Sequence, residues 1–326
     1  VMVKSKAKKS EVKKQSSSRS EADDAAQLAE DAQALMDRFD VHEAMKLYRR
    51  ALHLEPDNAA LLEAFGEACL QMGQRDEACE AFGRSVELQP DGGAHRYMYL
   101  GQLRSGAEAV ESFARGVAIL RSERAAVEQR SGSREELQQA WVEATHALVS
   151  GLCSTAEIYL TDACDEPNAE ESCEALAMEA LSLVESLEVQ TLAEPFVTAA
   201  NLRLSQQRND EATELLVKAC SVVSSCDEAN LPPFDLRLSM CRMLMEVDLS
   251  AEAVEHLQNL RLEDDDSLEL RYLLCYAAFQ TNNTELGADE LEKAIAFAQT
   301  PACDPDEKEW LPQLLELQSE QAGMEG

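Results

Sequence analysis

The stretch EAFGEACLQMGQRDEACEAFGRSVELQP, residues 63–90, decides the fold of this chain because its small, aromatic and proline residues recur at a fixed spacing. The preceding block, EDAQALMDRFDVHEAMKLYRRALHLEP at residues 30–56, carries the same markers. A period of this length is typical of repeat proteins. The matching pairs, each 34 positions apart, are Ala44 and Ala78, Tyr48 and Phe82, Pro56 and Pro90, and Ala32 and Gly66.

The spacing resembles that of the tetratricopeptide repeat, in which each unit is a pair of antiparallel helices. Gly66 and Ala78 fall where the two helices of such a hairpin approach closely, and Phe82 would fill the gap between them. Pro90 ends the second helix, because proline cannot continue a helix. We therefore predict an all-α fold, a tetratricopeptide-repeat superhelix of about seven helical hairpins with a C-terminal capping helix.

The repeats are predicted to form a single solenoid over residues 22–322. Ser133 and Glu136 have the spacing of a capping box and predict the start of a helix. In the last segment, Leu311, Leu314 and Leu315 have the spacing of one apolar helix face, which suits a cap over the final repeat. The predicted units lie near residues 25–58, 59–92, 93–130, 134–190, 193–226, 234–266 and 268–300, and the cap lies at 306–322.

The charge of the chain is strongly acidic and unevenly distributed. Its 326 residues include 62 acidic and 29 basic side chains, a formal net charge of −33. A nucleic-acid-binding protein needs a basic face, so this balance excludes that class and indicates a basic partner or a need for solubility. Residues 1–21 differ, because they hold seven Lys or Arg residues. We predict a basic disordered tail there, either a solvated tail or a nuclear-import patch.

Nothing in the sequence predicts catalysis. The five histidines fall in separate units without an H-E-x-x-H motif, and the ten cysteines include no C-x-x-C pair. His146 and Cys153 lie seven residues apart, a spacing that favours packing over a catalytic pair. No apolar run reaches the roughly 18 residues of a membrane span. We predict a monomer that is not an enzyme, has no catalytic residue, cofactor or metal, and does not contact a membrane or nucleic acid directly.

The sequence feature most informative about function is a long segment that lacks positive charge. Residues 135–202 contain 14 acidic side chains and no Lys or Arg, and six of the acids lie in the predicted loop 162–174. Two interpretations fit: a solubilising face, or a groove that receives a basic chain. Solenoids of this kind bind through the first helices of their hairpins. The candidate partner-binding residues are Glu63, Glu67, Met98, Glu157, Asp235, Arg242, Met245, Glu269, Tyr272, Tyr276 and Phe279.

The last three candidates form a set, because Tyr272, Tyr276 and Phe279 are spaced four and three residues apart. Leu274 and Ala278 would then take the opposite, packed face, and the aromatic residues would be either core or anchors for a partner. A micromolar complex needs about 8 kcal/mol, whereas exposed ion pairs contribute roughly 0.2–1 kcal/mol each. Acidic residues would therefore steer and select a partner, and apolar anchors would hold it.

Three features together resemble one family, the dedicated assembly chaperones of the large-subunit ribosomal protein L4. They are the regular opening repeats, the unit TAEIYLTD (155–162) followed by EPNAEESCEAL (166–176), and the acidic body; the resemblance covers roughly residues 22–322. It implies capture of the newly made basic ribosomal protein through its long internal loop and escort to the nuclear pre-60S particle. It also implies a location in cytoplasm and nucleus, and an import receptor reached through the client.

A second functional class stays open, a scaffold or adaptor subunit of a multiprotein complex. In that case the acidic residues only solubilise the chain, and its apolar surfaces make the contacts. A chaperone bound to a basic loop should lose affinity steeply with salt, and an apolar scaffold contact should not. A clamp for acidic chaperone tails is not expected, because Ala29, Gln33 and Ala64 stand where such a clamp needs Lys, Asn or Arg.

Overall fold

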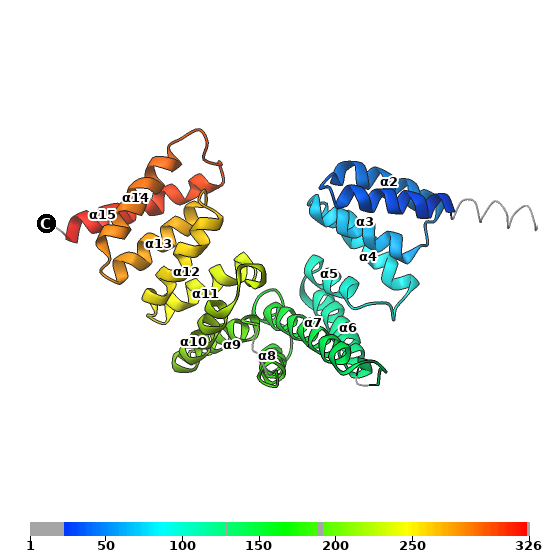
Figure 1. Ribbon diagram of the computed structural model, residues 1–326. Coiled ribbons are helices and arrows are strands. Elements are labelled where there is room, and N and C mark those ends of the chain that lie inside the picture. The colour runs from blue at the N-terminus through cyan, green and yellow to red at the C-terminus, as the bar shows by residue number, and fades with distance from the viewer. Residues whose placement is uncertain (1–22, 128, 188–191, 325–326) are drawn as a thin grey trace, which may run out of the picture. The chain divides into compact units, whose positions relative to one another are not determined.

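The computed structural model describes residues 23–127, 129–187 and 192–324, and all regular secondary structure in these ranges is helical (Figure 1). The predicted all-α fold is therefore confirmed, and the predicted tail at 1–21 lies outside the described residues. A first helical segment covers residues 23–36. The helices that follow are α2 (Val41–Leu54), α3 (Ala59–Gln71), α4 (Arg75–Leu88), α5 (His95–Leu103), α6 (Gly106–Val127), α7 (Arg134–Leu160), α8 (Ala169–Glu185), α9 (Glu194–Ser205), α10 (Asn209–Ser225), η1 (Glu228–Asn230), α11 (Phe234–Glu246), α12 (Ser250–Glu263), α13 (Leu268–Gln280), α14 (Thr284–Ala298), η2 (Glu307–Trp310) and α15 (Leu311–Met324).

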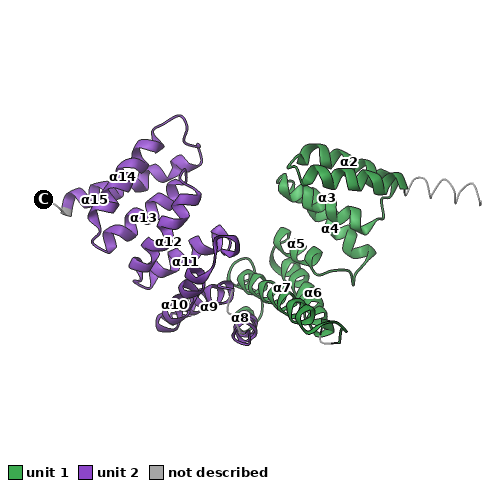
Figure 2. Cartoon of the chain, viewed as in Figure 1, with its two compact units in different colours: residues 1–172 green, residues 173–326 purple. Residues whose placement is uncertain are grey.

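The chain divides into two compact units, residues 1–172 and 173–326 (Figure 2). In the first unit, α3 packs on α4, α5 on α6, and the long helix α7 along α6. In the second unit, the pairs are α9 with α10, α11 with α12 and α13 with α14, and α15 packs on α14. The single solenoid over residues 22–322 stays a prediction.

The contact between a small residue and an aromatic ring sets the distance between the two helices of a hairpin. A Cβ atom on Gly66 of α3 would lie 2.8 Å from the Phe82 ring of α4, and one on Gly101 of α5 would lie 2.5 Å from Phe113. These distances are below van der Waals contact, so only glycine allows the two helices to approach this closely. The packing roles predicted for Gly66 and Phe82 are thus confirmed.

The turns inside the hairpins share a backbone requirement that the repeat markers did not reveal. Phe39 and Gly73, which are 34 residues apart, adopt φ angles of 61° and 68°. Asp248 and Asn282 form a second such pair, at 62° and 57°. The left-handed conformation costs an ordinary residue roughly 1–2 kcal/mol, so Phe39 is an unusual choice. Its ring is also 89% exposed.

The predicted start of α7 and the predicted apolar face of the last helix have different outcomes. Ser133 accepts a hydrogen bond from the Glu136 backbone, and the Glu136 carboxylate accepts one from the Ser133 backbone, which confirms the predicted capping box. The prediction for the apolar face of the last helix was wrong at Leu315, which is 44% exposed. Leu314 and Leu317 are the buried residues of α15, so the face that packs is rotated around the helix axis from the predicted one.

The ten cysteines are free thiols, and six of them are buried in the helical cores. Burial raises the pKa of Cys241 and of Cys275 to about 12, and that of Cys69 to about 11. These side chains therefore behave as small apolar residues at neutral pH.

The packing at Gly66 predicts opposite effects for two glycine-to-alanine changes. Gly66→Ala should destabilise the chain by about 1–3 kcal/mol, because the new methyl group overlaps the Phe82 ring. Gly83→Ala, on the helix that carries Phe82, should stabilise it by about 0.5–1 kcal/mol, because the nearest atom to its Cβ is 4.0 Å away and alanine favours a helix. Thermal unfolding followed by circular dichroism measures both, and shifts of equal sign would contradict this account.

Candidate functional site

The first candidate in the amino-terminal unit, Glu63, makes its contacts within the protein. Its carboxylate lies 2.9 Å from Nη1 of the buried Arg96 and 2.8 Å from Nε2 of His95. The Ser85 hydroxyl donates a further hydrogen bond to it over 2.7 Å. With only 17% of its side chain exposed, Glu63 fixes the junction of α3, α4 and α5. It has little capacity left for a partner.

The other candidates of this unit have different surroundings. Glu67 is half-buried, and its charge adds to burial in raising the pKa of Tyr48 and of Tyr99. Met98 packs over two glycines, since Cβ atoms on Gly116 of α6 and Gly151 of α7 would lie 2.8 and 3.3 Å from its side chain. Met98 is therefore a packing residue. Glu157 on α7 is exposed.

In the carboxy-terminal unit, two candidates bind each other. Arg242 of α11 forms an ion pair with Glu269 of α13, which joins the first helices of consecutive hairpins. The positive charge of Arg242 thus neutralises an acid that was predicted to face a partner. Asp235, at the start of α11, is exposed, and Met245 is half-buried.

The aromatic set is partly packed and partly open. The rings of Tyr272 and Tyr276 stack with centroids 6.3 Å apart, and Tyr272 also lies 5.5 Å from Trp310 of η2. Phe279 covers Gly287 of α14, so it is a packing residue. Tyr276 is 37% exposed and is the open member of the set. Leu274 and Ala278 are buried on the opposite face, as predicted.

Sequence reasoning missed a group of buried arginines. Arg96, Arg203, Arg237 and Arg271 each retain less than a tenth of their surface. Each is matched by an acid, as in the two hydrogen bonds of 2.6 and 2.7 Å from Arg237 to Glu263. Because a buried charge without a partner is costly, these acids are structural. The signal was available in part, since Arg237 and Arg271 are one repeat period apart.

The acidic run 135–202 is largely open to solvent where the structure describes it. In the first unit its exposed members include Glu143, Glu157 and Asp162. In the second unit, cations from beyond the run pair with two of its members: Arg203 with Glu174 at 2.9 Å and Lys218 with Glu185 at 3.9 Å.

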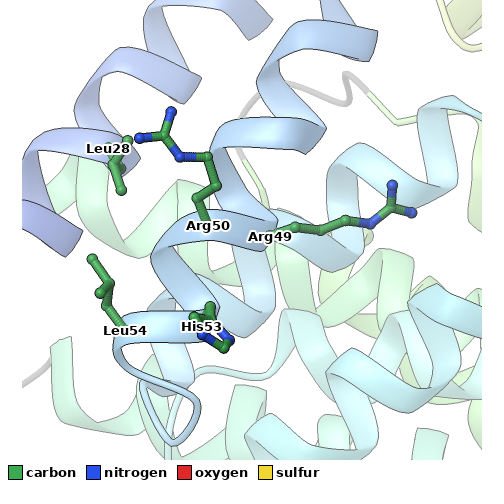
Figure 3. A pocket seen from close by; sticks show the side chains of 5 residues that line it. All are labelled: Leu28, Arg49, Arg50, His53 and Leu54. Atoms are coloured by element: carbon green, nitrogen blue, oxygen red, sulfur yellow. The ribbon is translucent and has the colours of Figure 1, made fainter.

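One cavity of about 440 Å³ in the first unit is basic instead of acidic (Figure 3). Leu28, Arg49, Arg50, His53 and Leu54 line it. Arg49 extends away from the two leucines, pairs with Glu77 at 2.7 Å and lies over the Phe65 ring. Arg50 also lines the cavity. Its positive charge makes the cavity unsuitable for a Lys- or Arg-rich segment.

Among the described residues, no group of three or more His, Cys, Asp or Glu side chains is arranged to hold a metal ion. None of the described helices is both long and apolar enough to cross a membrane.

Comparison with known proteins first defines the class. Residues 35–99 match the family model of the tetratricopeptide repeat. A tetratricopeptide repeat protein from Parabacteroides merdae has a similar fold, with a TM-score of 0.53 and 14% sequence identity over 90% of this chain and 98% of that one. The chain is therefore a tetratricopeptide-repeat protein, as predicted.

Closer similarity then defines the family. The solved structure of residues 1–338 of the Assembly Chaperone of RpL4 (Acl4) has a TM-score of 0.70 and 31% identity, over 81% of this chain and 99% of that one. The "Probable assembly chaperone of rpl4" of Schizosaccharomyces pombe is 32% identical over 61% of this chain and 57% of its own length. The chain belongs to the family of assembly chaperones of RpL4.

The predicted resemblance to this family is thus confirmed. The chain spans about half the length of the curated relatives it matches, 57% of one and 55% of the other. These relatives are named as chaperones and not as enzymes, in agreement with the prediction that the chain is not an enzyme.

The Arg203–Glu174 contact predicts a pH-dependent contribution to stability. The hydrogen bond from Arg203 lowers the pKa of Glu174, so the pair stabilises the fold above the unfolded-state pKa of about 4.3 and is lost as pH falls through the lower folded pKa. Glu174→Gln should cost about 1 kcal/mol at neutral pH, a value kept small because the carboxylate is 39% exposed and screened by solvent. Urea midpoints at several pH values measure the difference from the parent.

The matched control is Glu171→Gln, on the same helix, because Glu171 is exposed and has no ion pair with a described residue. Its midpoint should follow that of the parent at every pH. If the cost of Glu174→Gln persists unchanged at about pH 2–3, the ion pair is not its source.

Proposed function

We propose that this chain is an assembly chaperone that binds newly made ribosomal protein L4 through an extended basic segment, the client's internal loop. The names of the relatives supply the client. The observation that supports the mode of binding is the run 135–202, in which 14 acidic residues occur without one Lys or Arg. The binding surface is formed by the first helices of the hairpins and is concave in this proposal.

Physical chemistry explains why such a client needs such a partner. Basic segments of a ribosomal protein are unpaired until RNA is present, and they aggregate or bind other polyanions. An acidic helical surface replaces the missing phosphates, and RNA displaces it because its charge density is higher. In this proposal the complex forms in the cytoplasm, enters the nucleus with an import receptor bound to the client, and releases the client on the pre-60S particle.

Contacts inside the protein support some of the candidate residues over others as contacts for the client. Glu63 and Glu269 have partners inside the protein, so an exposed acid such as Asp235 is better placed to receive a basic side chain. Tyr276 is the best-placed anchor, because its ring is both exposed and supported by the stacked ring of Tyr272. Aromatic side chains of this kind contribute most of the affinity in many interfaces.

The test is a calorimetric titration of the full chain with the isolated internal loop of RpL4, at about 0.05 and about 0.5 M salt. We expect tight binding at low salt, a loss of affinity on the order of tenfold or more at high salt, and weak binding of a scrambled loop of equal charge. Equal binding of the two peptides would mean a generic polyanion. Binding that is insensitive to salt would favour the scaffold alternative, and no binding would refute the proposal.

Removal of the Tyr276 ring tests the anchor. Tyr276→Ala should weaken binding of the loop about tenfold, because the apolar contact it provides is lost while the acidic surface remains. The control is Phe39→Ala, which removes a ring that is 89% exposed in a turn and is not part of the first helix of a hairpin. Equal losses of affinity in the two variants would show that the contact with Tyr276 is not specific.

For the Arg242–Glu269 pair we predict a substitution that strengthens binding of the loop. Arg242→Gln should tighten binding of the basic loop by about twofold to fivefold, because it removes an internal cation that competes for Glu269. Arg208→Gln is the control, since Arg208 pairs within its own turn with Glu211. If Arg242→Gln weakens binding, Arg242 itself contacts the client.

A further inference from the structure

Five of the second helices of the hairpins carry a positive charge at one fixed position. Six residues after the small packing residue of each helix, the sequence places Arg50 in α2, Arg84 in α4, Arg115 in α6, Lys218 in α10 and Lys293 in α14. Helix α8 has no cation at this position, since the sixth residue after its buried Cys173 is Glu179. Helix α12 also breaks the pattern. Its packing residue is Ala253, and the sixth residue after it is Asn259.

The cation has a defined partner in the complete hairpins. Arg84 binds Asp57, in the connection that leads into its hairpin, at 2.8 Å. Arg115 binds the equivalent Asp91 at 2.6 Å. In α14, Lys293 pairs at 2.5 Å with Asp289, four residues earlier on the same helix. The position therefore neutralises acids on the preceding connection and on the helix itself.

At Asn259 a cavity of about 460 Å³ takes the place of the cation. Two acids line it from the positions just described: Glu228 from the connection before the hairpin, and Glu255 four residues before Asn259. Neither acid forms an ion pair with a residue that the structure describes. Leu231 and Leu262 supply apolar walls, and Leu262 is 77% exposed.

A buried polar side chain also faces this cavity. His256 lines it, retains 8% of its surface and makes no hydrogen bond to any of the described residues. Burial lowers the pKa of His256, so the ring is neutral at neutral pH and can accept a hydrogen bond. Arg237 does not satisfy these groups, because its guanidinium binds Glu263 and the Pro232 carbonyl.

In the first hairpin the other half of the ion pair is missing: the cation is present and the acid is not. Its cation, Arg50, has no ion pair with any described residue, and no hairpin precedes it in the described part of the chain. Here too a cavity is found, the one lined by Leu28, Arg50 and Leu54 (Figure 3). In both places, a cavity is present where one half of the ion pair is missing.

We propose that the cavity at Asn259 receives a lysine or arginine side chain of the bound client. The aliphatic stem would lie on Leu231 and Leu262, and the cationic end would bind Glu228 and Glu255, as Arg84 binds Asp57 in its own hairpin. This inference rests on the proposed function, a basic client. It adds a contact on the second helix of a hairpin, outside the first-helix surface.

The test supplies the missing cation from the chain itself. Asn259→Lys should fill the cavity and weaken binding of full-length RpL4 about fivefold to tenfold, because the client's side chain is displaced and one charged hydrogen-bonded contact is lost. Gln258→Lys adds the same charge to the neighbouring exposed position, which does not line the cavity, and should change the affinity less than twofold. Calorimetry measures both, and thermal unfolding checks that both variants remain folded.

Equal affinities in the two lysine variants would overturn the inference while the proposed function stands. Failure of the parent chain to bind RpL4 would refute the proposed function instead. The cavity can then be tested alone with the probe peptide acetyl-Ala-Arg-Leu-Ala-amide, followed by methyl NMR signals of Leu231 and Leu262. Shifts that appear in the parent and in Gln258→Lys, but not in Asn259→Lys, support the site, and unchanged signals in the parent refute it.

Discussion

The close contact between a small residue and an aromatic ring is the constraint on which the other features of this chain depend. At Gly66, Gly101 and Gly287 a Cβ atom would lie within 3 Å of a phenylalanine ring, so these sites tolerate no side chain without displacement. This contact holds the two helices of a hairpin at a short distance. It also fixes which residues of the first helix remain exposed, and thereby decides that Tyr276 is open while Leu274 and Ala278 are buried.

In so acidic a chain, the acids that matter for binding are those that the protein does not neutralise itself. Buried arginines engage Glu63, Glu174 and Glu263, and a row of cations on the second helices engages Asp57 and Asp91. These contacts are structural, because they satisfy charges that would otherwise be costly to bury or would repel one another. Counting acids therefore overestimates the surface available to a basic partner.

The fold could be predicted from the sequence because its determinants are local and periodic: the small residues, the rings, the prolines and the capping box of Ser133 and Glu136. The candidate site was harder to predict because the state of a carboxylate depends on its neighbours in space. Glu63 is engaged by Arg96, which is 33 residues away, and Glu269 by Arg242, 27 residues away. Asn259 has no distinguishing feature in the sequence. Only the ion pairs of the equivalent cations in the structure show that a positive charge is missing at this position.

The distribution of the buried thiols has a consequence for how opening of the chain can be observed. Cys69, Cys153, Cys241 and Cys275 lie in four different helices, α3, α7, α11 and α13, and each is buried. A thiol that is buried and protonated does not react until its own hairpin opens. Helical repeats open locally, with free energies that differ along the array. The rate at which each of these cysteines is alkylated thus reports how often its own hairpin opens. A bound client that stabilises a hairpin would slow alkylation of the cysteine in that hairpin.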